Sequence, residues 1–451
     1  MPLHTRIALI LLSLSGCGGE TAAPTDAGAN ADLAAPMNTD LAMVGADLAM
    51  VGADLAMAPL MGFPVLPVAP VPSGRVLQVG ASRMYKAPCA AIAAAMDGDT
   101  IEIDAATYAG DTCRIGANRL TLRGVGGRPV LDLNKVKPSG CKGIWVVGGN
   151  DTLIEDIEFT GAHLRPTDPF VMTGACTADK NGAALRVEGS NLTVRRCSIH
   201  DNDDGILTGA GPTSAILIER STFRNNSFDG YSHNLYIGQI AQLTFRGNSS
   251  TRTGADGHLL KSRAKLNVIV GNRLTGEDGP DSYELNFPNG GETYVIGNVV
   301  QQGNASSNRA MLDYASEGIP MGWDNHLYVV NNTFVNRRQA GATFLQLAGA
   351  PLCTAVNNLF AGSKNSAITN LPNAVTMATN LTDDAGDPKF VDEARFDFHV
   401  QAGSPVTGVG SDPGKAAAGY SLAPMVQYVE PADLAPRPVK VKLDVGAFAA
   451  P

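Results

Sequence analysis

A short sequence pattern recurs along the chain, and this repeat constrains the fold more than any other feature. Each copy places alternating apolar residues before an anchor residue, which is usually asparagine, and one apolar residue after it. The anchors are Cys197, Ser221, Asn248, Asn272, Asn298, Asn332 and Asn358. Their successive steps are 24, 27, 24, 26, 34 and 26 residues. A period of this size is typical of repeat architectures, in which each repeat packs on its neighbours.

The pattern of residue types within the repeats predicts short strands. Alternating apolar runs are broken by Gly, Asn and Asp, and the 50 glycines and 27 prolines argue against a long helical bundle. Three short strands per repeat predict a parallel β-helix, in which coils stack ~4.8 Å apart and polar anchors form a hydrogen-bonded ladder at one bend. Leucine-rich repeats are the competing architecture, but they require leucines at dense fixed positions, and these repeats mix Val, Ile, Phe and Leu. We expect residues 73–451 to form one solenoid of about a dozen coils.

The first residues predict export and a lipid anchor. Arg6 precedes the apolar run 7–14, which is too short to span a bilayer and is followed by small residues. Residues 14–17 resemble a bacterial lipobox, so we predict that 1–17 is a lipoprotein signal and that Cys17 is lipidated. An ordinary signal peptide is the alternative. The absence of Asp after Cys17 is typical of lipoproteins sorted to the outer membrane, and we expect a membrane-anchored protein there or at the cell surface.

Residues 18–72 are predicted to be a disordered tether. The sequence Asp-Leu-Ala-Met recurs at Asp40, Asp47 and Asp54, a period of seven residues. A coiled coil is the alternative, but each period carries one Leu and one Gly, too little apolar surface for a seam.

The remaining composition narrows the chemistry. Besides Cys17 there are six cysteines, an even number that permits disulfides after export, and proximity favours Cys89–Cys113 and Cys141–Cys176 among 15 possible pairings. The sequence contains no Cys-x-x-Cys pair, so a structural zinc site is not expected. The net charge of -9 argues against a nucleic-acid partner.

From about residue 75 onward the chain resembles right-handed parallel β-helix proteins of the pectate-lyase-like superfamily. The opening segments 90–92, 98–103 and 107–108 are similar to the N-terminal cap and first coil of that superfamily, and 387–390 with 403–405 to its closing segment. Segments 232–238, 257–264 and 288–291 resemble a bacterial subgroup of exported β-helix proteins without a settled activity. An insertion at about 164–179, which carries Cys176, departs from the pattern.

The repeat register predicts which side chains share one face. Four leucines fall at one inward position, namely Leu235, Leu260, Leu285 and Leu312. Because side chains alternate across a strand, the residues on either side of each leucine are expected to point outward. One predicted outward ladder is Tyr236, Lys261, Asn286 and Asp313. The ladder before it is Asn234, Leu259, Glu284 and Met311.

Further polar residues fall near these ladders. Arg263 lies in the next outward ladder, and His233 and His258 align three residues before Tyr236 and Lys261. For the two histidines, inward stacking near a bend is the competing prediction. The long step between Asn298 and Asn332 predicts a loop that carries Tyr314, Glu317 and Trp323 beside this face.

We expect this face to act on an acidic polysaccharide, most simply as a lyase that cleaves a uronate-containing glycan by β-elimination. Lys261 is the candidate base, as the resemblance to β-helix alginate lyases implies. Arg263 is expected to bind the uronate carboxylate, and Tyr236 or His258 to protonate the leaving oxygen. The reaction is expected to need either no cofactor or Ca²⁺, for which Glu284, Asn286 and Asp313 are candidate oxygen ligands.

Two alternatives stay open. Glu284 and Asp313 are the carboxylate pair of a possible glycoside hydrolase, although the paired-Asp and Gly-His-Gly motifs of polygalacturonases are missing. The second alternative is a non-catalytic surface lipoprotein that binds glycan or has a structural role. The residues expected to contact glycan are His233, Asn234, Asn286, Tyr314 and Trp323. We expect the protein to be a monomer.

Overall fold

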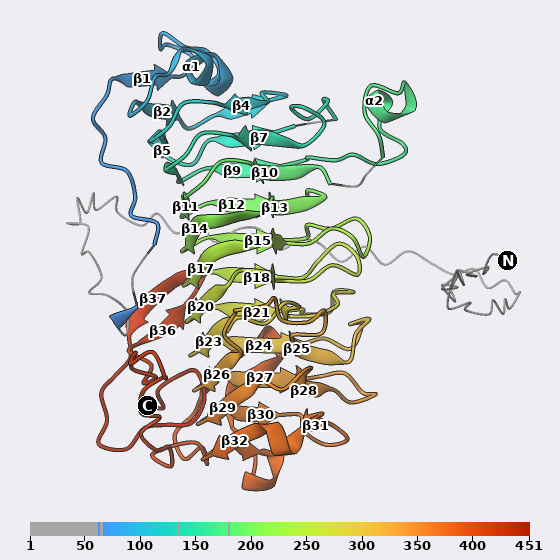
Figure 1. Cartoon of the computed structure of the whole chain (residues 1–451), viewed down its shortest axis with the longest axis vertical. Helices are drawn as coiled ribbons and strands as arrows, with labels where there is room; N and C mark the ends of the chain where they lie inside the picture. The colour runs from blue at the N-terminus through green and yellow to red at the C-terminus, as the bar shows by residue number, and fades with distance from the viewer. Residues whose placement is uncertain (1–61, 64–65, 134, 179–180) are drawn as a thin grey trace, which may run out of the picture. The chain divides into compact units, whose positions relative to one another are not determined.

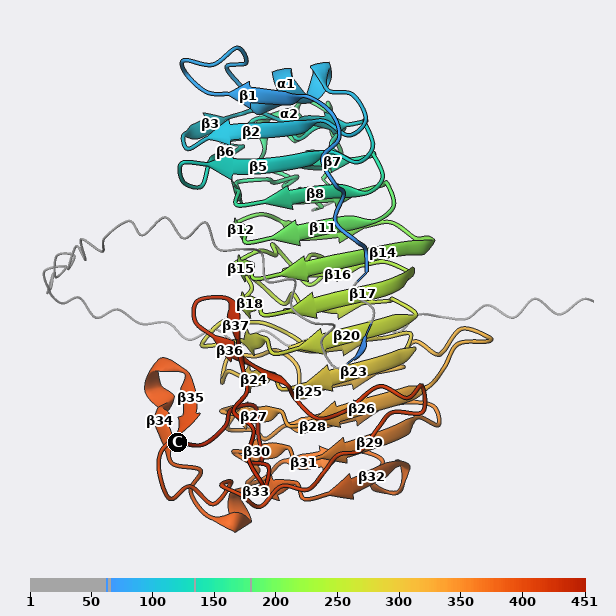
Figure 2. The same ribbon diagram turned by 90° about the vertical axis from the view of Figure 1, so that its left-hand side faces the viewer.

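The computed structural model describes residues 62–63, 66–133, 135–178 and 181–451. The predicted signal, Cys17 and the predicted tether as far as residue 61 lie outside these residues. Within the described residues, three long parallel sheets contain twelve, eleven and ten strands, which we call sheets A, B and C. Figures 1 and 2 show the strands of successive coils stacked on one another. The predicted parallel β-helix is therefore confirmed.

In the complete coils the strands follow one another in the order A, B, C, whereas the first strand, β1, stands alone and the last coil ends in sheet B. Sheet A runs from β1 (Val76–Val79) to β32 (Val375–Ala378), and sheet B from β3 (Thr107–Ala109) to β33 (Leu381–Thr382). The strands of sheet C are β4 (Cys113–Ile115), β7 (Gly143–Val147), β10 (Ala183–Val187), β13 (Asp204–Thr208), β16 (Leu235–Ile237), β19 (Lys261–Ser262), β22 (Leu285–Phe287), β25 (Ala310–Tyr314), β28 (Thr343–Leu347) and β31 (Ala367–Thr369). All neighbouring strands of sheet C pair in parallel.

The interior is filled by apolar side chains stacked coil upon coil. The predicted inward leucines, Leu235, Leu260, Leu285 and Leu312, are all fully buried in one continuous core. Leu285 and Leu312 are direct partners in the pairing of β22 with β25. The register that the sequence repeat predicts is thus the register of the sheet.

A ladder of polar side chains fixes the bend between sheets A and B. The Asn272 side chain accepts from the backbone N–H of Asn248 (2.9 Å) and donates to the Asn298 side-chain oxygen (2.9 Å) and to the carbonyl of Phe245 (2.8 Å). The same pattern continues as far as Asn380. The residue before each anchor adopts a left-handed conformation, as at Gly271 (φ +61), which turns the chain sharply enough to aim the amide along the stack.

Replacing a ladder residue should destabilise the whole solenoid. Asn272→Ala leaves buried donors and acceptors on the two adjacent coils without these partners, at about 1–3 kcal/mol each, so we expect a total loss of about 2–5 kcal/mol in the free energy of unfolding. Denaturant unfolding measures this loss. Asn373→Ala, at an exposed position, is the control and should change stability by less than about 0.5 kcal/mol. An equal effect of the two substitutions would contradict a stabilising role for the ladder.

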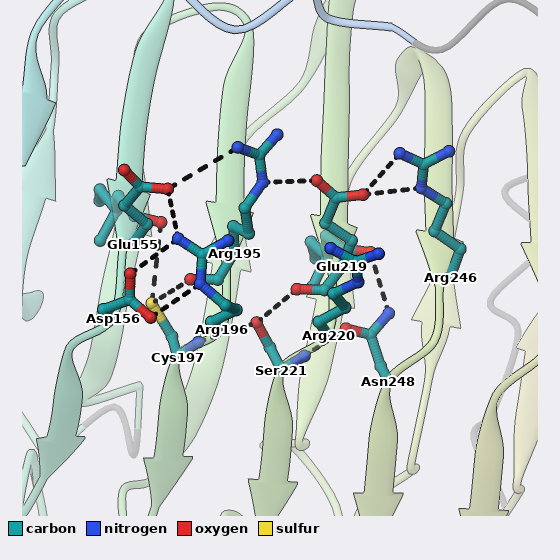
Figure 3. Close-up of polar contacts among 12 residues, drawn as sticks. Glu155, Asp156, Arg195, Arg196, Cys197, Glu219, Arg220, Ser221, Arg246 and Asn248 are labelled. Carbon is teal, nitrogen blue, oxygen red and sulfur yellow. Dashed lines mark hydrogen bonds and ion pairs between the residues drawn. The ribbon is translucent and has the colours of Figure 1, made fainter. Parts of the chain in front are cut away.

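Charged side chains form a second ladder on the outside of sheet A (Figure 3). The alternating series is Glu155 of β8 (Thr152–Glu155), Arg195 of β11 (Leu192–Arg195), Glu219 of β14 (Gly211–Glu219) and Arg246 of β17 (Ile240–Arg246). Glu219 lies 2.6 Å from Arg195 on one side and 2.6 Å from Arg246 on the other. Because the strands pair in register, opposite charges meet on adjacent coils and stabilise that register.

Both predicted disulfides form near the first coils. Cys89 of the capping helix α1 (Pro88–Ala94) is bonded to Cys113 of β4, and the Cys141–Cys176 bond closes the insertion that contains α2 (Pro169–Met172). In the described part of the chain, Cys197 and Cys353 remain buried thiols, so the even count does not extend to a third disulfide. Neither helix described here is long and apolar enough to cross a membrane.

Two segments return to cover the outside of the coils. Phe63 is buried and packs edge-on against Tyr294 of sheet A at 4.5 Å, and Figure 2 shows the following segment running along that sheet. The folded part therefore begins before residue 73, the boundary expected from composition. The reason is that Phe63, in a segment with little other regular structure, packs on an apolar surface of sheet A. The C-terminal hairpin of β36 (Val426–Val429) and β37 (Asp433–Pro436) covers the neighbouring surface.

Backbone and side-chain bonds fasten the returning C-terminal segment. Asn331 Nδ2 donates to the carbonyl of Asp444 (2.8 Å), and the N–H of Ala447 donates to Thr333 Oγ1 (2.9 Å). Residues more than a hundred positions apart in the sequence are joined in this way.

Candidate functional site

The predicted outward ladder exists on sheet C. Tyr236 pairs with Lys261, Lys261 with Asn286, and Asn286 with Asp313 in the register of four successive strands. Gln346 continues the ladder one coil further. These side chains stand on the outer side of the sheet because each alternates with an inward-facing residue of its strand.

Lys261 is the ladder residue whose charge contacts an aromatic ring instead of an acidic group. Its side chain is half-buried, and Nζ lies 5.0 Å from the centre of the Tyr236 ring. Among the described residues, the Lys261 ammonium makes no hydrogen bond or ion pair. Burial lowers the pKa of Lys261, and the positive charge of Arg263 lowers it further, against the opposing effect of Glu317 and Asp313. The neutral amine is therefore more accessible here than in an exposed lysine.

Arg263 lies two residues further along the chain and is held by three contacts. Its Nε donates to the Tyr236 hydroxyl (3.0 Å), and one terminal nitrogen donates to Asn289 Oδ1 (2.7 Å). The two terminal nitrogens also bind the Glu317 carboxylate in a fork, at 2.7 and 3.0 Å. The Arg263 guanidinium lowers the pKa of Glu317. The position of Arg263 therefore favours carboxylate recognition.

Asn286 and Asp313 are covered and satisfy one another. Asn286 Nδ2 donates to Asp313 Oδ2 (2.7 Å), and Asp313 also accepts from Ser316 Oγ (2.5 Å) and Gln346 Nε2 (2.9 Å). Burial raises the pKa of Asp313. These contacts leave the two side chains little capacity to bind a substrate or an ion directly.

The ladder preceding Lys261 does not point outward as predicted. Asn234 and Glu284 are fully buried in the interior. Asn234 Nδ2 donates to Ser250 Oγ and to the carbonyl of Thr251, both at 3.1 Å. Both residues come just before their strands, β16 and β22, so the alternation that holds within a strand does not apply to them. The expected outward positions of Asn234 and Glu284 are wrong.

The donor set expected for Ca²⁺ is consequently not assembled. Glu284 lies inside the solenoid, whereas Asp313 and Asn286 lie outside and bind each other. Within the described residues, no group of three or more His, Cys, Asp or Glu side chains is placed to hold a metal ion. The carboxylate pair suggested for glycoside hydrolysis, Glu284 with Asp313, is separated by the sheet for the same reason.

The two aligned histidines stack inside the bend. The rings of His233 and His258 lie 4.4 Å apart and are nearly parallel, and both residues are buried. The His233 Nδ1 accepts from the N–H of His258 (3.1 Å), and the His258 Nδ1 faces the N–H of Tyr283 (3.4 Å). Burial lowers the pKa of His258 to about 3. The stacked arrangement is therefore confirmed, and His258 and His233 do not line the outer face as the acid or the glycan contact.

The remaining predicted residues lie at the end of β25 and in the loop that follows it. Tyr314 is the last residue of β25, points inward, and donates its hydroxyl to the carbonyl of Gly291 (2.8 Å), so its predicted contact with glycan is wrong. Trp323 is half-buried further along the loop, and its glycan contact stays a prediction. The loop also brings Glu317 to Arg263, a contact that the sequence pattern did not reveal.

Comparisons with known proteins agree with this architecture. A family model described as the right handed beta helix region matches residues 113–274. The structure is similar to that of pectate lyase Pel9A, with a TM-score of 0.51 and 14% identity over 84% of this chain and 97% of that chain. The chain therefore folds as a right-handed parallel β-helix.

Two weaker similarities involve enzymes with other activities. Pectin methylesterase from Aspergillus niger, in deglycosylated form, aligns with a TM-score of 0.32 and 12% identity over 70% of this chain and 85% of that chain. The PL6 family alginate lyase AlyGC, as a mutant, aligns with a TM-score of 0.29 and 13% identity over 68% of this chain and 51% of that chain. No curated protein sequence matches the chain.

Two neighbouring buried carboxyl groups, those of Glu284 and Asp281, should make the stability of the protein depend on pH. Burial raises the pKa of Glu284 well above its usual range and that of the neighbouring Asp281 to about 6. The folded state then binds more protons than the unfolded state from about pH 4 upward, so stability should fall as the pH rises through about 6 and beyond. Thermal unfolding from about pH 4 to 8 measures this trend.

A matched pair of substitutions isolates the effect. Glu284→Gln keeps the shape of the side chain but removes the ionisable group. It should therefore reduce the decrease in unfolding temperature that accompanies rising pH. Asp278→Asn, at an exposed position of the same loop, should leave it unchanged. A wild-type protein whose stability rises between pH 4 and 6 while Glu284→Gln does not alter the slope would contradict this assignment.

Proposed function

We propose that this chain is a polysaccharide lyase that cleaves a uronate-containing glycan by β-elimination, with Lys261 as the base. One observation carries the proposal. A half-buried lysine without a hydrogen bond or ion pair among the described residues stands on the outer side of sheet C, beside an arginine whose guanidinium binds a carboxylate. A lysine with no role is usually exposed to solvent. Partial burial of the Lys261 charge costs free energy, which favours a functional reason for its position.

The chemistry of β-elimination matches these groups. The base removes the proton on the sugar carbon next to the carboxylate, a carbon–carbon double bond forms, and the glycosidic oxygen leaves with a proton from an acid. The lowered pKa of Lys261 increases the fraction of neutral amine at a given pH. The rate should therefore rise with pH through a midpoint below 10.5, the ordinary lysine value.

Arg263 and Tyr236 supply the other two functions in this proposal. Arg263 binds the substrate carboxylate and stabilises the negative charge that grows on it as the proton is removed. The Tyr236 hydroxyl accepts a hydrogen bond from Arg263, which leaves its own proton free to be donated to the leaving oxygen. Similarity in fold to a pectate lyase supports the polysaccharide lyase class over a purely structural role.

The N-terminal sequence supports a proposal for the location of the protein. We propose that Cys17 carries lipid and that the tether holds the β-helix outside the outer membrane, where large glycans are accessible. Cys17→Ala should abolish lipid labelling and release the protein from the membrane fraction. Unchanged labelling and membrane binding would contradict the anchor.

Removing the base should abolish turnover. We expect Lys261→Ala to lower kcat about 10²–10⁴-fold, the usual contribution of a general base, while the fold is kept because the Lys261 ammonium makes no hydrogen bond or ion pair among the described residues. The measurement is the ultraviolet absorbance of unsaturated product from polygalacturonate, alginate and other uronate polymers. Lys265→Ala, at an exposed lysine four residues later, is the control. Full activity of Lys261→Ala on a cleaved polymer would exclude the assignment.

Arg263 should affect both binding and rate. Its carboxylate contact exists in the ground state and strengthens in the transition state, so Arg263→Ala should raise KM and lower kcat. Arg263→Lys should restore little of this loss because a lysine cannot form the two-pronged contact. A change confined to thermal stability would show that Arg263 is only a structural residue.

A further inference from the structure

The loop between β25 and β26 (His326–Val330) places a carboxylate on the proposed substrate-binding arginine. The loop backbone is anchored where it begins, because the N–H of Glu317 donates to the carbonyl of Pro288 (2.8 Å) and Asn289 Nδ2 donates to the carbonyl of Gly318 (3.2 Å). These bonds position the Glu317 side chain so that its two oxygens meet the two terminal nitrogens of Arg263.

The two partners of this ion pair differ in how firmly they are held. Arg263 is 17% exposed and is also bound by Tyr236 and Asn289, whereas the Glu317 side chain is 51% exposed. Arg263 therefore keeps its orientation when Glu317 leaves. Among the described residues, the Glu317 side chain makes hydrogen bonds and an ion pair to Arg263 alone, so it can move into water without breaking another such bond. An exposed pair of this kind is held weakly.

We propose that Glu317 is a built-in competitor for the substrate, and that its carboxylate occupies the place that a substrate carboxylate takes on Arg263. This inference rests on the proposed function and deepens it, because it defines the sugar that the site selects. The sugar at this position carries a free carboxylate, which can replace both bonds of Glu317 to Arg263. A neutral or esterified sugar cannot replace them and would leave Arg263 bound to Glu317.

Removing the competitor should tighten binding of acidic glycans. Without Glu317, Arg263 is free before substrate arrives and the site carries one negative charge less. We expect Glu317→Ala and Glu317→Gln to bind short oligogalacturonates or oligomannuronates about two- to fivefold more tightly, the range expected when an exposed ion pair no longer competes. Neutral oligosaccharides such as maltohexaose should show no gain.

The experiment uses calorimetric titration in two backgrounds. Affinity is compared between Lys261→Ala and the double variant Lys261→Ala with Glu317→Ala, so that no turnover occurs, and KM is compared between the wild type and Glu317→Ala. Glu393→Gln is the matched control, because Glu393 has the same exposure and pairs with Arg337 beside a different sheet. It should leave affinity and KM unchanged.

The outcomes separate this inference from the proposed function. Tighter binding and a lower KM for acidic glycans alone would support a competitor. Weaker or unchanged binding, with Lys261→Ala still inactive, would overturn the competitor while leaving the lyase in place, since Glu317 would then be a brace for Arg263. If a folded wild type neither binds nor cleaves any uronate polymer, both the lyase and the competitor are overturned.

Discussion

The amide ladder at the bend between sheets A and B is the interaction on which the rest of this structure depends. Each ladder asparagine joins three successive coils through both its oxygen and its nitrogen, and it does so in the interior, where an unpaired amide is costly. A coil that slipped by one residue would break these bonds and turn its leucines outward. The ladder thus fixes a single pairing register for repeats of unequal length. All the other rows of stacked side chains are aligned by that register.

That register is what allows a site to be assembled from distant residues. Tyr236, Lys261, Asn286 and Asp313 come from four coils and become neighbours because the strands pair in parallel at fixed offsets. Arg263 joins them because residues two apart on an extended chain face the same side. The long loop after β25 departs from the repeat, and it delivers a carboxylate side chain that binds Arg263 from outside the sheet. The scaffold therefore fixes the base and the arginine, while a loop controls what reaches them.

The sequence predicted most of what the repeat controls and little of what it does not. The period and the anchors predicted the sheets, the inward leucines and the ladder that includes Lys261. The orientation of Asn234 and Glu284 was predicted wrongly because both precede their strands, at a bend where two-residue alternation has already ended. Gln346 could have been found by extending the Lys261 ladder one coil further. The contact between Glu317 and Arg263 could not, because no repeat dictates the path of that loop.

The returning C-terminal segment changes how this solenoid can come apart. A stack of coils that contact only their neighbours can fray from an end, one repeat at a time. Here the bonds from Asn331 to Asp444 and from Thr333 to Ala447 fasten the late segment across coils formed more than a hundred residues earlier. Those coils must open together with the segment, so the C-terminal half gains the cooperativity of a globular domain. Folding incurs the corresponding cost, because such distant contacts close a long loop and form late.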